Sequence, residues 1–324
     1  MIYSCFDVGG TAIKFGLIDE EGRFHKRGLI PSGDGPSIVT AVRNLVRQQQ
    51  KEVSLAGIAL STAGIVNTES GTVEHALSIP GYTGTQWKTM LEEEFKLPVS
   101  VENDTNCAAL GEYWLGAGKD VSSFFSVTVG TSIGGAIIEE GRVLHGATHA
   151  AGEIAYMCLP AGRFHDVASA SFLCSEIANQ KGIPPKEMDG YRAFQLIESD
   201  DAQALRCFHI FCQNLADGLT NIISLFNPER IILGGGIMSR ESIIRHPLEQ
   251  ALSDRLPKRM LPPKGLAFAR LQNDAGLLGA LYVLKNSKFS ASDRFFPTKK
   301  KVKGTKHLGL LFIPYNRFYC IGSL

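Results

Sequence analysis

The strongest constraint on the fold is a short pattern that occurs once in each half of the chain. In the first half, "IYSCFDV" runs into the turn Asp7-Val-Gly-Gly-Thr11, and a second apolar segment follows. In the second half, "FFSVTV" runs into Gly130-Thr131-Ser-Ile-Gly-Gly135, and again an apolar segment follows. Short apolar runs bounded by glycine predict strands joined by tight turns. The repetition predicts two similar domains that face each other across a cleft.

The segments around these turns predict a mixed sheet with helices, an α/β class. Helical periodicity is clearest at 202–226, where apolar residues recur on one face and Asn227-Pro228 ends the pattern. The order is the same in both halves: strands come first, and helices and further strands follow. The predicted strands are 2–8, 12–18, 23–30, the start of 55–66, 97–103, three within 124–144, and 230–238; the other predicted helices are 37–50, 84–95, 104–117 and 273–286.

Charge and cysteine usage exclude several classes of protein. The formal net charge is +1, but residues 285–324 carry +8, so the rest of the chain carries −7. A mildly acidic body does not predict a nucleic-acid partner. No apolar run approaches the ~20 residues that span a bilayer, and the N-terminus does not read as a signal peptide. Seven scattered cysteines then predict free thiols in the cytoplasm.

The glycine turns have a chemical interpretation and a structural one. Consecutive backbone N–H groups without a Cβ form a concavity that binds anions, and a Thr hydroxyl adds a donor for a phosphate oxygen. An Asp in the same turn can hold Mg²⁺ directly or through water. The structural interpretation is a hairpin with a glycine bulge. No P-loop is present, and Gly234-Gly235-Gly236 does not fit a dinucleotide motif.

Five segments together resemble the ROK family (repressor, open reading frame, kinase) of sugar kinases and regulators. They occur in the family's order and approximate spacing, and the resemblance covers about residues 2–285. The segments are "DVGGTAIKFG", "ENDTNCAALGE", "VGTSIGGAI", "HGATHAAGEI" and "ILGGGI".

The resemblance implies a duplicated actin-like ATPase fold, related to ribonuclease H, with ATP and Mg²⁺ as cofactors. It implies a first domain at 1–118 joined by the returning helix 274–286, and a second domain at 119–273. The residues implied to grip the ATP phosphates are Asp7, Gly9, Gly10, Thr11, Gly130, Thr131, Gly134 and Gly135, and those against the adenosine are Gly234, Gly235 and Gly236.

Phosphoryl transfer to a sugar hydroxyl needs a base, and "VENDTN" supplies a carboxylate after a strand, where ligands of α/β folds bind. A helix N-terminus favours the ionised form of Asp104, although Asp in such a position also serves as a helix cap. By the resemblance, Asp104 is the catalytic base. Asn103, Gly64 and Glu153 then bind the sugar together with Asp104.

The family's zinc module is missing. Tyr156 stands where the family usually has a His that contacts sugar and zinc. Cys158, His165 and Cys174 are too widely and irregularly spaced to predict a zinc site. Ala63 and Asn67 replace the family's usual Pro and Asp around Gly64. The chain thus resembles the zinc-free branch, which includes β-glucoside kinases.

The expected function is transfer of phosphate from ATP to the 6-hydroxyl of a hexose or β-glucoside. Glucokinase and N-acetylmannosamine kinase activities stay open. A sugar-responsive regulator is a second class, but such regulators carry an N-terminal helix-turn-helix, for which the position of Asp7 leaves no room. By the resemblance we expect a homodimer that binds sugar and ATP, without membrane or nucleic-acid partners. The basic tail 287–324 lies outside the resemblance.

Overall fold

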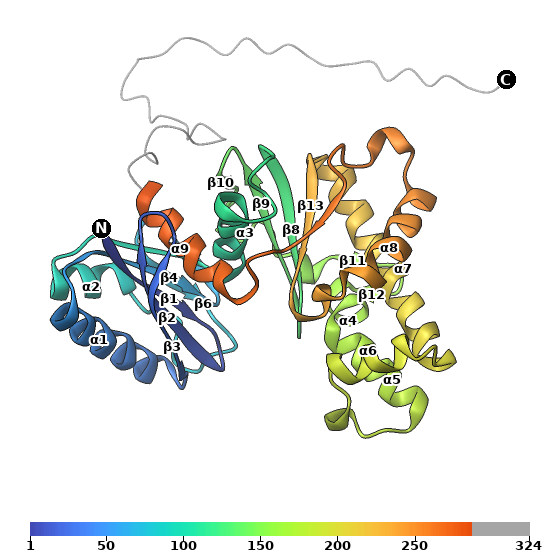
Figure 1. The fold of residues 1–324 in the computed structure, drawn as a ribbon, viewed down its shortest axis with the longest axis horizontal. Coiled ribbons are helices and arrows are strands. Elements are labelled where there is room, and N and C mark those ends of the chain that lie inside the picture. The colour runs from blue at the N-terminus through green and yellow to red at the C-terminus, as the bar shows by residue number, and fades with distance from the viewer. Residues whose placement is uncertain (287–324) are drawn as a thin grey trace, which may run out of the picture. The chain divides into compact units, whose positions relative to one another are not determined.

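The computed structural model describes residues 1–286, and two five-stranded sheets organise them (Figure 1). The strand order of the first sheet is β3-β2-β1-β4-β7. β1 pairs antiparallel with β2 and parallel with β4, and β4 pairs parallel with β7. Its strands are β1 (Ile2–Val8), β2 (Ala12–Asp19), β3 (Phe24–Pro31), β4 (Leu55–Thr62) and β7 (Val99–Asn103).

The second sheet has the same order and the same directions, β10-β9-β8-β13-β14. β8 pairs antiparallel with β9 and parallel with β13, and β13 pairs parallel with β14. The repeated pairing confirms the α/β class and the duplication predicted from the two glycine turns. Its strands are β8 (Ser123–Val129), β9 (Ile133–Glu139), β10 (Arg142–Val143), β13 (Arg230–Gly234) and β14 (Leu266–Phe268).

The helices begin and end at residues that explain their limits. Asp34 accepts a hydrogen bond from the N–H of Ser37 and so caps α1, and Asp201 caps α7 in the same way. Asn227, in the left-handed conformation, ends α7. The helices are α1 (Gly35–Glu52), α2 (Trp87–Phe95), α3 (Asp104–Leu115), α4 (Phe164–Ala168), α5 (Ala170–Lys181), α6 (Gly190–Glu198), α7 (Ala202–Phe226), α8 (Glu241–Arg255) and α9 (Ala275–Asn286).

Helices α3 and α9 cross closely and connect the two halves of the chain. The backbone of Gly279 lies against the carbonyl of Cys107, and that of Gly111 against the carbonyl of Ala275, with no room for a Cβ at either glycine. From α9, Leu277 and Leu281 pack into one cluster with Cys5 of β1. From α3, Ala109 and Leu110 pack with Phe124 of β8. Each of these helices therefore covers a sheet formed mainly by the other half of the chain.

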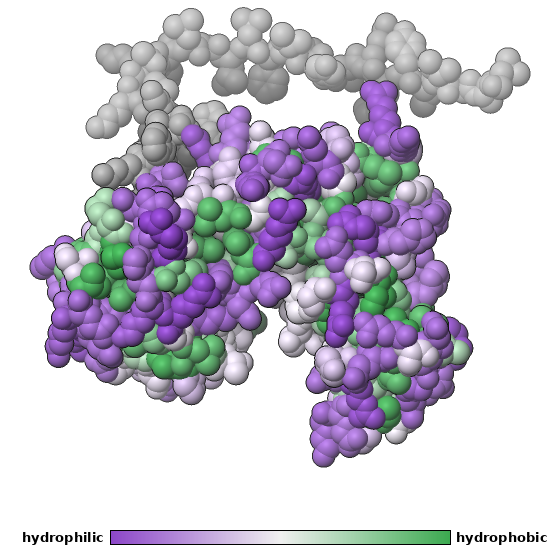
Figure 2. All heavy atoms as spheres, viewed as in Figure 1, coloured by the Kyte–Doolittle hydropathy of each residue, from purple (hydrophilic) through white to green (hydrophobic). Residues whose placement is uncertain are grey.

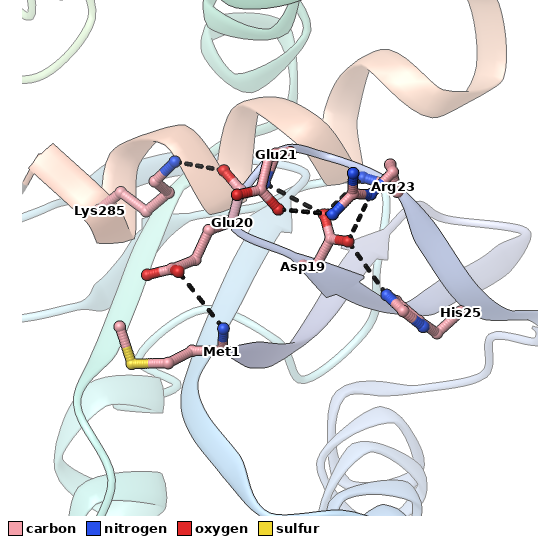
Figure 3. Close-up of polar contacts among 7 residues, drawn as sticks. All are labelled: Met1, Asp19, Glu20, Glu21, Arg23, His25 and Lys285. Carbon is pink, nitrogen blue, oxygen red and sulfur yellow. Dashed lines mark hydrogen bonds and ion pairs between the residues drawn. The ribbon is translucent and has the colours of Figure 1, made fainter.

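The turn between β2 and β3 is a dense polar network, shown in Figure 3. The Asp19 carboxylate accepts bonds from Glu21 N (3.1 Å), Arg23 N (2.9 Å), Arg23 Nε (2.8 Å) and His25 Nε2 (3.1 Å). Burial raises the pKa of Asp19, but these hydrogen bonds lower it by a larger amount. The net pKa of Asp19 therefore lies well below its usual range. Lys285 of α9 also donates to the carbonyl of Glu20, which fastens α9 to this turn.

On the face shown in Figure 2, hydrophobic residues form separate patches among hydrophilic ones. Within residues 1–286, no helix is both long enough and apolar enough to cross a bilayer. Two short hairpins complete the described fold, β5 (Ile65–Asn67) with β6 (Thr72–His75) and β11 (Cys158–Leu159) with β12 (Gly162–Arg163).

Candidate active site

Asp7 lies at the carboxyl end of β1 with its side chain largely buried. Its Oδ1 accepts a hydrogen bond from Ser61 Oγ at 2.7 Å, and its Oδ2 is 3.2 Å from Lys14 Nζ. A Cβ on Gly276, in the first turn of α9, would lie 2.8 Å from the Asp7 carboxyl carbon. The start of α9 therefore packs directly against this carboxylate.

The turn after β1 presents exposed backbone. Gly9 N–H bonds to the carbonyl of Ala12 at 3.1 Å, and the carbonyl of Gly9 accepts from Ser32 Oγ at 2.6 Å. Gly10 and Thr11 are exposed. A Cβ on Gly10 would meet nothing closer than the carbonyl of Ser78 at 3.6 Å, so the space above the turn can take a ligand.

The matching turn after β8 lies between the two segments that carry the predicted sugar-binding residues. A Cβ on Gly134 would lie 2.8 Å from Thr105 Oγ1, one residue beyond Asp104. The backbone of Gly135 packs tightly on that of Gly152, one residue before Glu153. Within the turn, Gly130 N–H bonds to the carbonyl of Ser132 at 2.8 Å, and Thr131 is exposed.

Asn103, and not Asp104, is the residue that caps α3. Its Oδ1 accepts from the N–H groups of Thr105 (2.9 Å) and Asn106 (3.1 Å). Its Nδ2 donates to the carbonyl of Gly64 (3.0 Å) and to Asp104 Oδ1 (2.9 Å). Gly64 has φ of +102°, which a side chain would strain. Three of the four predicted sugar-binding residues are thus joined by direct hydrogen bonds.

The Asp104 carboxyl is held in an unusual electrostatic environment. Burial and the negative charges of Asp7 and Glu153 raise its pKa to about 6, although hydrogen bonds from Thr105 N and Asn103 oppose the shift. Burial also raises the pKa of Glu153. Two carboxylates from distant parts of the chain therefore act on Asp104, an arrangement found more often at functional sites than elsewhere.

The three glycines at the end of β13, Gly234 to Gly236, mark the point where the strand stops. Gly235 has φ of +101°, and a Cβ there would collide with the carbonyl of Val129. Gly236 has open space around it, with no atom within 4 Å of an added Cβ. The chain turns into a 3₁₀ helix at Gly236–Ser239, so the strand ends at Gly234 rather than at residue 238 as predicted.

A hollow of about 320 Å³ lies beside the second turn. It is bordered by Thr131 of that turn and by the start of α6 at Gly190, which in turn lies close to Ile237 after the glycine run. Both polar and apolar side chains line the hollow. They include Ala170, Ser171, Cys174, Ser175, Pro185, Met188 and Asp189.

Two contacts of the turns were not predicted from the sequence. Lys14 is paired directly with Asp7 in the β1–β2 register. Counting outward from a turn at 9–11 would pair Asp7 with Ile13 instead, so the hairpin pattern alone did not indicate this contact. Ser132 Oγ lies 2.9 Å from His165 Nδ1, and 33 residues separate the two, so no local pattern indicated this contact.

The segment that replaces the zinc module folds as the β11–β12 hairpin followed by α4 and α5. Cys158 is exposed, His165 contacts Ser132, and Cys174 is half-buried. Among residues 1–286, no group of three or more His, Cys, Asp or Glu side chains is arranged to hold a metal ion.

Comparison with known proteins identifies the family. The ROK family profile matches residues 3–287. A β-glucoside kinase of Listeria monocytogenes is 33% identical over 296 residues, covering 87% of this chain and 97% of that protein. A ROK family protein of Streptococcus pneumoniae, solved in complex with sucrose, has a TM-score of 0.80 at 28% identity, covering 89% and 99% of the two chains. A ROK family glucokinase of Streptomyces griseus, solved with glucose and AMPPNP, has a TM-score of 0.76 at 25% identity, covering 88% and 100%. The chain therefore belongs to the ROK family and has its actin-like ATPase fold.

Proposed function

We propose that this ROK family sugar kinase transfers the γ-phosphoryl group of ATP to the 6-hydroxyl of a hexose or β-glucoside, with Asp104 as general base. The observation that carries the proposal is the half-buried Asp104 carboxyl, whose pKa of about 6 is raised by burial and by the charges of Asp7 and Glu153. A base with a pKa just below neutrality is ionised at pH 7, yet it is basic enough to take a hydroxyl proton.

The roles of the two turns follow from their open backbone. The exposed Gly10, Thr11 and Thr131 offer N–H and hydroxyl donors to phosphate oxygens. Lys14, already beside Asp7, supplies a positive charge near the same turn. The hollow beside Thr131 suits the nucleoside, because it combines apolar and polar walls next to the glycine run. The glucokinase solved with AMPPNP supports a nucleotide in this family's fold.

A magnesium ion fits the carboxylate of Asp7. Mg²⁺ commonly takes one or two carboxylates together with substrate phosphates and water, and Asp7 is the carboxylate at the first turn. The ion would neutralise charge on the phosphates. Asp104 would accept the proton of the reacting sugar hydroxyl. Asn103 and Glu153 would bind other hydroxyls of the sugar and so orient it.

For the sugar, we favour a β-glucoside. The closely matching β-glucoside kinase and the relative solved with sucrose both support a pocket with room beyond one ring. Tyr156, three residues after Glu153, is 64% exposed and leaves its ring free to face a second sugar. We also propose a zinc-free, cytoplasmic homodimer with domains at 1–118 plus 274–286 and at 119–273. The tail 287–324 lies outside the described residues.

An assay of ADP release over a panel of sugars tests the proposal. The panel contains glucose, cellobiose, methyl β-glucoside and N-acetylmannosamine, and Asp104→Asn protein serves as the blank. We expect ADP release with at least one sugar and the highest kcat/KM with a β-glucoside. A hundredfold preference for free glucose would exclude a β-glucoside as the preferred substrate. A site that hydrogen-bonds the free anomeric hydroxyl of glucose discriminates strongly against a sugar that lacks it.

A further inference from the structure

One buried carboxylate near the site has no part in the proposed chemistry. Glu102, one residue before Asn103, is 3% exposed. Its Oε1 accepts from Asn103 N at 2.8 Å and from Asn106 Nδ2 at 2.9 Å. A buried carboxylate is costly unless its charge is paired and its oxygens are bonded. The second oxygen therefore needs a strong donor.

That donor is His145, which comes from the other half of the chain. Its Nε2 lies 2.7 Å from Glu102 Oε2. Since an ionised carboxylate can only accept, Nε2 carries the proton. Burial lowers the pKa of His145, but the bond to Glu102 and the charge of that carboxylate raise it more, so the net pKa is raised. The contact is a charge-assisted bond, stronger than one between neutral groups.

His145 also closes the loop that leads to Glu153. Its carbonyl accepts from Ala151 N at 3.0 Å, two residues before Glu153. The ring of His149 meets the ring of His145 edge to face, with centroids 5.8 Å apart, and His149 has a φ of +56°. A non-glycine residue in this conformation needs support from its surroundings. The side chain and the backbone of His145 therefore both hold the segment 145–153.

The two partners each precede a predicted sugar-binding residue. Glu102 bonds to the backbone of Asn103, the cap from which Asp104 follows. His145 begins the loop that ends at Glu153. We propose that the Glu102–His145 bond is a clasp that sets the position of Glu153 relative to Asn103 and Asp104, and that His145 is a positioning residue for the sugar. This inference rests on the sugar site proposed above.

The test compares three variants of the full-length protein. His145→Ala removes the donor, and His145→Gln keeps an N–H at a similar distance from the backbone. His209→Ala, at an exposed position on α7, is the matched control. Sugar KM and kcat are measured for each with the best sugar of the panel, and amide hydrogen exchange of residues 145–153 is measured without ligand.

We expect His145→Ala to raise the sugar KM about 10- to 100-fold, as displaced binding groups do, with a smaller change in kcat. His145→Gln should recover most of the loss, and His209→Ala should match the wild type. Exchange in 145–153 should be faster in His145→Ala alone. A sugar KM within twofold of wild type in His145→Ala, or no recovery in His145→Gln, would overturn the clasp. If the wild type phosphorylates no sugar, the proposed function fails, and the exchange data alone decide: unchanged exchange in His145→Ala would reject the clasp.

Discussion

Two aspartates in the first half of the chain show how differently the fold treats the same side chain. Asp19, at the end of β2, is surrounded by donors, and bonds from Arg23 and His25 bring its pKa well below the usual range despite burial. Asp104, after β7, shares its site with the charges of Asp7 and Glu153, and its pKa is raised to about 6. Asp19 is satisfied within the fold, whereas Asp104 is held under electrostatic strain.

The difference distinguishes Asp19, a structural carboxylate, from Asp104, the proposed base. A fold gains stability by pairing a buried carboxylate fully, as around Asp19. It loses stability by gathering like charges, and such arrangements persist where chemistry needs them. The sequence motif alone could not separate these roles, because Asp at a helix start also serves as a cap. The structure assigns the cap to Asn103.

The largest expected effect is on turnover. Asp104→Asn should lower kcat by about 10²–10⁴-fold, because the amide cannot accept the hydroxyl proton. Asp19→Asn should leave kcat within about threefold of wild type at a temperature where both proteins are folded. Steady-state ADP release at saturating sugar and ATP measures both. Equal losses in the two variants would show that Asp104 and Asp19 do not differ in role.

The next effect concerns the turn between β1 and β2, which we propose binds the ATP phosphates. Lys14→Met should lower kcat/KM for ATP by about 10²-fold, since a preorganised cation beside the phosphates is lost. Lys26→Met is the matched control, because Lys26 lies on β3 and pairs with Glu52 at 2.8 Å. The control should behave as wild type. An unchanged kcat/KM in Lys14→Met would show that Lys14 only balances the charge of Asp7.

The pH dependence of the wild type should report the raised pKa of Asp104. The base must be ionised, so kcat/KM for the sugar should rise with pH up to about 6 and then level off. Below that midpoint we expect about a tenfold loss per pH unit. A flat profile from acid to neutral pH would argue against Asp104 as the titrating base.

The smallest effects are on thermal stability, and they should have opposite signs. The pKa of Asp19 is lowered in the folded state, so its stabilisation is present at neutral pH and is lost as pH falls. Asp19→Asn should therefore lower Tm by a few degrees at pH 7, with a smaller difference in acid. The pKa of Asp104 is raised, so its ionisation costs stability as pH rises through 6.

Asp104→Asn should accordingly raise Tm at pH 7 and change it little below the pKa of a free Asp, about 4. Thermal melts followed by circular dichroism at both pH values give the comparison. Two variants that shift Tm in the same direction at pH 7 would contradict it.

The elements predicted from the sequence are those with a regular pattern. The helix 202–226 was predicted with its observed limits, because its apolar residues keep one period over 25 residues and Asn227 ends it. For the strands on either side of both glycine turns, the predicted limits match the observed limits within a residue or two. The sequence pattern indicates no element between Glu153 and Asp201, although this segment contains α4, α5 and α6. α4 has only five residues, and α5 buries only Leu173, Ile177 and Ala178, so neither shows a clear period.

The parts of the site that escaped prediction depend on contacts between distant residues. His145 and Glu102 are 43 residues apart, and no local pattern joins them. The same holds for Ser132 and His165. The helix α8 contains Pro247, a residue that argues against a helix, so the sequence did not predict it. Local chemistry indicated the glycine turns and the proposed base, whereas these contacts between distant residues are seen only in the folded chain.

The most direct test of the central claim measures binding and chemistry in the same Asp104→Asn protein. Sugar and ATP affinities are measured by calorimetry, and phosphoryl transfer is followed in a single turnover by rapid quench. With Asp104 as the base, we expect affinities near those of the wild type and a transfer rate at least 10²-fold lower. Normal transfer, or loss of sugar binding with an unchanged transfer rate at saturation, would contradict Asp104 as the base.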